Sequence, residues 1–184
     1  MRINRIELGR GVFSVKMDKI AFFIKEDRVN GEAVGIRING EDFIEIVRRY
    51  ELPFARAEGF PFIAGDYTGL PPQDVLPPSY HFMAEQSNPL YVRGDKMKIL
   101  TCSGCPQSEC WPLYAEIVVE DDRVLWKGFE QPRRAGIWVY DKLGPFCFSR
   151  EEYQVALDLF EVENNGRPSR MRRRKLGVQQ RRGV

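Results

Sequence analysis

The sequence lacks any long apolar run. Nowhere in its 184 residues do apolar side chains approach the roughly 18 consecutive positions that a membrane-spanning helix needs. The first segment, MRINRIELGRGVF, carries charges where a secretory signal has its apolar core. These two absences predict a cytoplasmic protein that has no membrane partner.

Catalytic residue types are also scarce. There is a single histidine, His81, so any Ser-His-Asp or Cys-His mechanism would have to use it. Its neighbours Tyr80 and Phe82 are more typical of a buried structural histidine. The sequence contains no P-loop and no G-x-G-x-x-G motif. The balance favours a non-catalytic protein, and His81 is the one candidate for a catalytic residue.

The chain does have enough apolar material for a core. It is 43% hydrophobic, 12% aromatic and 29% charged, which is typical of a folded globular domain. A chain of this length folds as one domain without needing disulfide bonds. We expect a single domain over 1–166 and a separate basic tail over 167–184.

Basic and acidic residues are unevenly distributed between these two parts. The tail holds eight of the 28 basic residues and none of the 26 acidic ones. The 20 basic residues that remain leave the body with a net charge of −6. An acidic body is not typical of a nucleic-acid-binding domain. The basic composition of the tail is typical of a segment that binds nucleic acid.

The tail has few apolar residues, so we expect it to be disordered in isolation. One interpretation is a solvated terminus without a partner, and another is a segment that contacts an acidic protein surface. A third is a phosphate-binding segment, whose affinity would depend strongly on salt. The candidate nucleic-acid-binding residues are Arg170, Arg172, Arg173, Arg174 and Lys175.

Hydrophobic periodicity predicts a mixture of strands and helices. Strands are expected at 19–24, 34–38, 96–101, 114–120 and 123–131, and the last two should form a hairpin. One helix should carry the apolar stripe of Phe43, Ile46, Val47 and Tyr50, and Pro53 should limit how far it runs. A second helix should cover 149–162. This order predicts an α+β fold, in which two main helices pack on a mostly antiparallel sheet.

The segment 52–90 is predicted to be a long Pro-rich loop that covers the core. It holds seven of the twelve prolines, and a loop of this length is usually either functional or disordered. Its many apolar residues favour packing over disorder; they include Phe54, Phe60, Phe62, Tyr67, Leu70 and Phe82. The alternative is that the loop lines a groove for a ligand.

Three of the four cysteines, Cys102, Cys105 and Cys110, fall within nine residues. In a reducing compartment such a cluster is more typical of a metal or redox site than of disulfide bonds. A structural zinc ion takes four ligands. Cys147 and His81 are therefore the candidates for a fourth zinc ligand.

The cysteine cluster has other interpretations. An iron–sulfur cluster requires a spacing that these cysteines do not have. A redox-active pair requires the C-x2-C segment to open a helix, whereas Pro106 and a strand-like stretch follow it. The main alternative to zinc is a set of ordinary reduced cysteines on a turn before the hairpin.

Several motifs resemble those of an uncharacterised bacterial protein family, for which no activity is established. They are ECWPLYAEIVV, VLWKGFEQPRR and LGPFCFSREEYQVAL, together with ELPFARAEG and GLPPQDVLPPSYHF, and they span about Val34 to Leu159. The family places a cysteine-rich turn before its CWPL motif. Its first two cysteines are usually closer together than Cys102 and Cys105, and the position of Cys147 is often not cysteine. The resemblance therefore implies no functional residues and disfavours Cys147 as an obligatory ligand.

These features together favour a non-catalytic cytoplasmic protein that binds a protein partner in an accessory or regulatory role. The first alternative is a small enzyme or ligand-binding protein with a site around His81 and the cysteine turn. The second is a protein that associates with nucleic acid through the Arg-rich tail.

Overall fold

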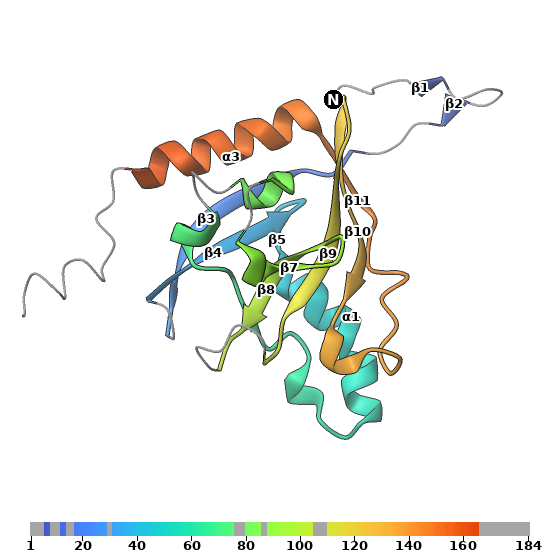
Figure 1. Cartoon of the computed structure of the whole chain (residues 1–184). Coiled ribbons are helices and arrows are strands. Elements are labelled where there is room, and N and C mark those ends of the chain that lie inside the picture. Colours follow the sequence, from blue (N-terminus) through green and yellow to red (C-terminus); the bar gives the residue numbers. More distant parts are fainter. Residues whose placement is uncertain are drawn as a thin grey trace, which may run out of the picture.

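The computed structural model describes most of the chain, and Figure 1 shows how its helices and strands are arranged. The described residues are 6–7, 12–13, 17–28, 31–75, 80–85, 88–104 and 110–165. The predicted α+β class is confirmed, since every pairing between named strands is antiparallel and two long helices accompany the sheets.

The larger sheet has the strand order β11-β10-β9-β8-β6, and β7 pairs with the opposite end of β8. β9 (Leu113–Val119) and β10 (Arg123–Glu130) form the predicted hairpin, in which Trp126 lies opposite Ile117. The other strands of this sheet are β6 (Tyr67–Thr68), β7 (Val92–Arg93), β8 (Lys96–Cys102) and β11 (Phe146–Ser149).

A second sheet contains β3 (Ile20–Asp27), β4 (Gly31–Ile38) and the short β5 (Glu41–Asp42). β3 and β4 pair along their whole length, and the buried side chains Phe22 and Ile36 lie opposite each other. Closer to the N-terminus, β1 (Ile6–Glu7) pairs with β2 (Val12–Phe13).

Hydrogen bonds join the two larger sheets at two places. At one, the backbone N–H of Asp18 donates to the carbonyl of Cys147 at 2.7 Å. At the other, the backbone N–H of Val34 donates to the carbonyl of Leu70 at 2.8 Å. The neighbouring Gly69 permits this approach, because a Cβ at that position would lie 1.8 Å from the carbonyl oxygen of Val34. The strands therefore follow one another in a closed hydrogen-bonded circuit around the core.

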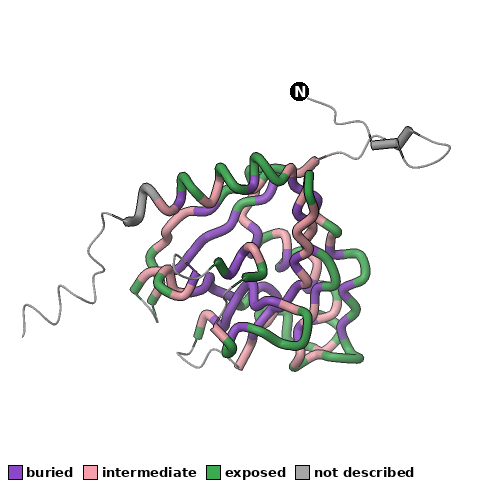
Figure 2. The backbone as a smooth tube through the Cα atoms, turned by 45° about the horizontal axis from the view of Figure 1, so that its top comes forward, coloured by how far each residue is buried: buried purple, intermediate pink, exposed green. Residues whose placement is uncertain are grey.

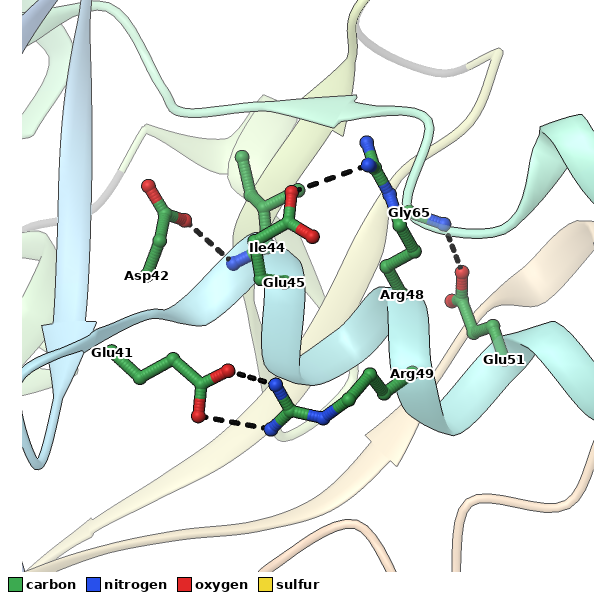
Figure 3. A network of polar contacts seen from close by, with 8 residues as sticks. All are labelled: Glu41, Asp42, Ile44, Glu45, Arg48, Arg49, Glu51 and Gly65. Atoms are coloured by element: carbon green, nitrogen blue, oxygen red, sulfur yellow. Dashed lines mark hydrogen bonds and ion pairs between the residues drawn. The ribbon is translucent and has the colours of Figure 1, made fainter.

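The two long helices are α1 (Phe43–Ala57) and α3 (Arg150–Asn165), and α2 (Pro72–Val75) is a single turn. Asp42 caps the N-terminus of α1, and its carboxylate accepts a hydrogen bond from the backbone N–H of Ile44 at 2.9 Å (Figure 3). α3 lies along β3 (Figure 1). The backbone N–H of Arg150 donates to the carbonyl of Asp122 at 3.0 Å, which fixes the start of α3 on the β9–β10 turn.

The first helix is longer than the sequence predicts. Pro53 is expected to limit the helix, but α1 continues for another turn beyond it, to Ala57. A proline removes one hydrogen bond from a helix interior. Beyond it, however, Ala55 is fully buried, and the N–H of Glu58 donates to the carbonyl of Phe54 at 3.1 Å. Packing of this last turn outweighs the effect of the proline.

Buried residues concentrate in the strands and recur along both long helices (Figure 2). Most of β8 and the middle of β4 are buried at consecutive positions, and therefore on both faces. Aromatic rings occupy the centre, where Trp126 stacks on Phe82 at 6.0 Å. The indole N–H of Trp126 donates to the hydroxyl of Tyr153 at 3.1 Å, and this hydroxyl donates to the carbonyl of Phe82 at 2.8 Å. The polar atoms of Trp126 and Tyr153 in the aromatic core are thus both paired.

The predicted covering loop packs on the core only in part. Tyr67, Leu70 and Phe82 are buried as expected. The expectation is wrong for Phe60 and Phe62, which are exposed, because the backbone N–H of Phe60 bonds back to α1 and the chain then turns outward. Besides α2 and β6, the segment forms three 3-10 helices: η1 (Pro61–Ile63), η2 (His81–Met83) and η3 (Pro89–Tyr91).

Candidate functional site

Four exposed apolar side chains adjoin the C-terminal half of α1. Phe62 is 76% exposed, Ile137 61%, Val139 53% and Phe60 52%. The rings of Phe60 and Phe62 meet edge-on with their centroids 6.0 Å apart. We refer to these four residues as the apolar face. Phe60 and Phe62 lie on the segment that follows α1, and Ile137 and Val139 flank Trp138, whose ring stacks on Phe54 of α1.

Five aromatic rings support one side of this face, and we call them the aromatic ladder. Successive centroids lie 5.7, 6.0, 6.1 and 6.0 Å apart along the order Tyr140, Tyr50, Phe54, Trp138 and Trp111. Tyr50 and Phe54 belong to α1, whereas Tyr140 and Trp138 belong to the loop that follows η4 (Pro132–Arg134). The ladder therefore fastens this loop to the helix.

Buried and exposed side chains alternate along the loop that follows η4, and this alternation explains why two aliphatic side chains face water. Trp138 is buried against α1, and its neighbours Ile137 and Val139 are exposed. The hydroxyl of Tyr50 donates to the carbonyl of Val139 at 2.8 Å and accepts from the backbone N–H of Lys142 at 3.3 Å. The exposed aliphatic side chains thus project from a backbone held at several points.

A buried carboxylate, that of Glu51, anchors the same region from inside. One of its oxygens accepts hydrogen bonds from the hydroxyls of Tyr67 at 2.7 Å and Tyr140 at 2.6 Å. The other accepts from the backbone N–H of Gly65 at 2.8 Å, as Figure 3 shows. Glu51 therefore connects α1 to the segment after Phe62 and to the loop that carries Val139.

Burial shifts the titration of these anchoring groups. Loss of solvent raises the pKa of Glu51, and the hydrogen bonds from Gly65, Tyr140 and Tyr67 oppose that shift in part. Burial and the adjacent Glu51 carboxyl raise the pKa of both tyrosine hydroxyls above the usual value. Because Glu51 is 0% exposed, it serves as an internal anchor that an external substrate does not reach.

Arg134 carries a positive charge at the edge of the aromatic ladder. Its guanidinium lies 4.9 Å from the ring centroid of Trp111 and 5.7 Å from that of Trp138, within cation–π range. The Nε atom is 3.2 Å from the carboxylate of Glu58, which also accepts a hydrogen bond from the indole N–H of Trp138. The charge is therefore held in one place.

The outer side of α1 carries ion pairs that Figure 3 shows beside Glu51. Arg49 pairs with Glu41 through both carboxylate oxygens, and Arg48 lies 3.3 Å from Glu45. The hydrogen bond from Arg49 lowers the pKa of Glu41. Exposed pairs of this kind contribute little to stability, and we assign them no part in the site.

His81 lies in η2 and is 0% exposed. Its Nε2 lies 2.7 Å from the carbonyl of Lys98 on β8. A carbonyl only accepts, so Nε2 carries the proton and Nδ1 is unprotonated. Nδ1 has no hydrogen-bond partner, and burial lowers the pKa of the imidazole. The histidine thus donates to a backbone carbonyl at the edge of β8. That carbonyl lies between the part of β8 that pairs with β7 and the part that pairs with β6.

The surroundings of His81 are those of a packed interior. Lys98 is 0% exposed, and its ammonium donates to the carbonyl of Leu90 at 3.0 Å. The same ammonium lies 4.8 Å from the ring centroid of Tyr91, whose hydroxyl donates to Asp74 at 2.7 Å. Cys102 is four positions beyond Lys98 along β8, so its Cα lies about 13 Å from that of Lys98 at the rise of an extended strand. The structure therefore does not bring Cys102 to His81.

The predicted metal ligands are only partly described. Cys102 is buried at the end of β8, and Cys110 is half-buried just before β9. Cys105 lies outside the described residues. Within the described ranges, no three His, Cys, Asp or Glu side chains converge as a metal-binding group. The geometry of a Cys102, Cys105 and Cys110 site thus stays a prediction.

Cys147 lies on a different strand of the larger sheet from Cys102. It is on β11, and two strands separate β11 from β8. Neighbouring strands lie about 4.8 Å apart, so the three steps from β11 to β8 separate Cys147 from Cys102 by about 14 Å in the direction across the strands. Its thiol contacts Met17 at 3.5 Å, and burial raises its pKa. The structure therefore does not bring Cys147 to Cys102, and residues 105–109 of the cysteine turn lie outside the described residues.

A hollow of about 640 Å³ lies elsewhere, where α3 begins. Its lining residues are Asp121, Asp122, Ser149, Arg150, Glu151, Gln154 and Val155. None of the residues predicted to form a site is among them. The tail residues Arg170, Arg172, Arg173, Arg174 and Lys175 lie outside the described part of the chain.

Comparisons with protein families, with characterised proteins and with solved structures found no match. Among the described residues, no helix combines the length and apolar character that crossing a membrane requires.

Glu51, Tyr140 and the aromatic ladder, which hold the two segments of the apolar face, are not among the residues predicted from the sequence. Glu51 follows Phe43 and Val47 at helical spacing, so its place on the buried stripe was detectable from the sequence. Its partner Tyr140 carries no comparable signal, since 89 residues separate the two. The aromatic ladder joins segments that only the folded chain brings together.

Proposed function

We propose that this is a non-catalytic cytoplasmic protein that binds a partner protein through the apolar face. The exposure of Phe62, at 76%, is the observation that supports the proposal most directly. Transferring one such ring from water to an apolar surface is favourable by about 1.5–3 kcal/mol. Aromatic anchors supply much of the binding energy at protein interfaces.

The rigidity beneath the face also supports this proposal. The aromatic ladder and the Glu51 hydrogen bonds hold both segments that present exposed apolar side chains. A surface that is already ordered loses less conformational entropy when it binds. An entirely mobile apolar loop would lack that advantage.

The interior ionisable residues fit a structural role better than a catalytic one. His81 is committed to a backbone carbonyl, and Glu51 to three donors. Both side chains are 0% exposed. We therefore favour partner binding over the enzyme or ligand-binding alternative around His81.

Site-specific photo-crosslinking tests the proposal. A benzophenone amino acid is placed at Phe62, at Ile137 or at the control position Leu159, which is 58% exposed on α3. The protein is then irradiated in the cells that produce it. We expect one discrete heterologous adduct from the first two positions and none from Leu159.

Two outcomes would reject the proposal. Equal adducts from all three positions would indicate non-specific contact, and no adduct from either Phe62 or Ile137 would indicate that the face has no partner. A product of twice the chain mass would identify a second copy of this protein as the occupant instead. Circular dichroism of each labelled protein verifies that the fold is retained.

A second candidate function is nucleic-acid binding by the tail over 167–184. Eight basic residues and no acidic ones favour it. In the full-length chain, replacing Arg172, Arg173 and Arg174 by glutamine should weaken binding to a duplex oligonucleotide and reduce its salt dependence. Binding that is unchanged by these substitutions would eliminate this function.

A further inference from the structure

We infer that the tail over 167–184 docks on the exposed side of α3 in the same chain. α3 ends at Asn165, so only Gly166 separates the tail from this helix. Exposed positions recur along α3 (Figure 2). Two of them are aliphatic, since Val155 is 50% exposed and Leu159 is 58% exposed. One helical turn apart, they form an apolar strip that a second segment can cover.

The apolar strip continues into the hollow of about 640 Å³ at the start of α3. The β9–β10 turn and the first turns of the helix line this hollow together, and Val155 belongs to its lining. Further along, the amide of Gln154 donates to the carboxylate of Asp158 at 2.8 Å, beside Leu159. These groups share one side of the helix, which we call the α3 surface. Its residues are Asp121, Asp122, Glu151, Val155, Asp158 and Leu159.

The α3 surface is acidic. α3 contains five acidic residues and one basic residue, Arg150, whose guanidinium donates to the carbonyl of Glu120 at 3.1 Å. The β9–β10 turn adds Asp121 and Asp122, both exposed. Arg123 beside them is paired with the carboxylate of Glu120. The tail, with eight basic residues and no acidic one, has the complementary charge.

Neighbouring groups do not cancel this acidic charge. β3, along which α3 lies, contains two acidic residues and one basic residue. Lys19 and Arg28 flank this strand, and Asp18 offsets one of them. The positive end of the α3 dipole amounts to about half a charge, which is less than the charge of Glu151 and Glu152 in the first turn.

The carboxylates at the hollow are open to a cationic partner. In the described ranges, none of the ion pairs involves Asp121, Asp122 or Glu151. All three residues are exposed. A basic segment can therefore reach them without breaking an existing pair.

The length of the tail fits a return along α3. The 16 residues of the helix rise about 24 Å in total. About seven extended residues, at about 3.3 Å each, cover that distance. Counted from Asn165, they bring residues 172–174, all arginine, to the hollow. Met171, just before them, then comes within reach of Val155.

The covalent connection favours the tail of the same chain over that of a second copy. A short flexible connection gives a tethered segment an effective concentration in the millimolar range. Exposed ion pairs are individually weak. Several of them suffice for docking when the segment is tethered, whereas a free second chain at micromolar concentration gains no such advantage.

Photo-crosslinking of the purified full-length chain tests the inference. A benzophenone amino acid replaces Val155, Leu159 or the control residue Ile137, which is 61% exposed. β10 extends from the turn that holds the start of α3 towards the loop of Ile137, so the control lies beyond its opposite end. The protein is irradiated at low micromolar concentration, and mass spectrometry after proteolysis identifies the linked peptides.

We expect Val155 and Leu159 to form links to the tail over 167–184 in a product with the mass of one chain. Ile137 should form none. The linked fraction from Leu159 should decrease when salt rises from about 0.05 M to about 0.5 M. An intramolecular link adds no mass, so Leu159 remains a valid control for heterologous adducts in the cellular experiment.

Substitutions that remove charge test the acidic part of the α3 surface. In D121N/D122N/E151Q, the ratio of linked to unlinked protein from Leu159 should fall about fivefold to tenfold, as expected for three exposed ion pairs. The matched control removes three exposed carboxylates elsewhere and should leave the ratio unchanged. Its substitutions are E45Q, D95N and D141N.

The arginines of the tail should act through the same carboxylates. R172Q/R173Q/R174Q should lower the ratio by a similar factor. Combining it with D121N/D122N/E151Q should lower the ratio little further, because each set of substitutions already removes the same ion pairs. Circular dichroism of every variant verifies that the fold is retained.

Four results would overturn the inference. The first is no link to the tail from either Val155 or Leu159, and the second is equal linking from Leu159 and Ile137. The third is a product of twice the chain mass, which would assign the α3 surface to the tail of a second copy. The fourth is undiminished linking in D121N/D122N/E151Q, which would remove the role of charge. None of them bears on the apolar face.

Discussion

The hydroxyl of Tyr140 donates a hydrogen bond of 2.6 Å to the carboxylate of Glu51, which lies 89 residues earlier in the chain. The second oxygen of that carboxylate holds the backbone of Gly65, just beyond Phe62. One buried acid thus fixes both segments that present the apolar face. The shape of the exposed surface depends on a group that never touches solvent.

Replacing Tyr140 by phenylalanine should lower the free energy of unfolding by about 1–3 kcal/mol, because a buried carboxylate loses one of its donors. Urea unfolding measures the change. Tyr80→Phe is the matched control, since Tyr80 is 46% exposed and a surface change of this kind stays within about 0.5 kcal/mol. Equal stability of the two variants would contradict an anchoring role for Tyr140.

His81 should make the protein less stable in mild acid. Burial lowers its pKa in the folded state, whereas the unfolded chain has the ordinary value of about 6.5. Between those two values the unfolded state binds more protons, so the free energy of unfolding falls as pH drops below about 6.5. His81→Gln retains an N–H donor for the carbonyl of Lys98 but does not titrate.

We therefore expect the free energy of unfolding of His81→Gln to decline less than that of the wild type between about pH 7 and pH 5. Burial raises the pKa of Glu51, which produces an opposite slope above about pH 4.3. That slope is common to both proteins and cancels in their difference. Identical slopes for the two proteins would show that His81 does not titrate on unfolding.

Local patterns predicted most of the regular elements. The alternation of apolar residues predicted β3, β4 and the β9–β10 hairpin, because a pattern that repeats every two residues is visible within a short segment. The helix expected over 149–162 appears as α3 (Arg150–Asn165). These elements depend on their own sequence, so no knowledge of the fold was needed.

The errors have a common physical origin in long-range packing. Pro53 is a local helix breaker, but contacts of Ala55 with the core extend α1 past it. Phe60 and Phe62 are apolar, yet the backbone turn after α1 leaves them in water. The apolar face could not be predicted, because its two segments are held by contacts such as that of Tyr140 with Glu51, which form only in the folded chain.

Gly69 should tolerate no side chain. A Cβ there would lie 1.8 Å from the carbonyl oxygen of Val34, so Gly69→Ala has to separate β4 from the chain after β6. We expect it to lower the free energy of unfolding by about 4 kcal/mol or more. Gly104→Ala is the control, because nothing lies within 4 Å of its Cβ position. Comparable thermal midpoints for the two variants would contradict the closed circuit of strands.

Cys147 should not take part in any metal site formed by the cysteine turn. Zinc–sulfur bonds are about 2.3 Å long, and two strands separate β11 from β8. Any zinc that the purified protein carries should therefore remain in Cys147→Ser and decrease in Cys102→Ser, as measured by elemental analysis. Because burial raises the pKa of the Cys147 thiol, Cys147→Ser should also leave the number of rapidly alkylated thiols unchanged. Loss of zinc in Cys147→Ser but not in Cys102→Ser would contradict the observed strand order.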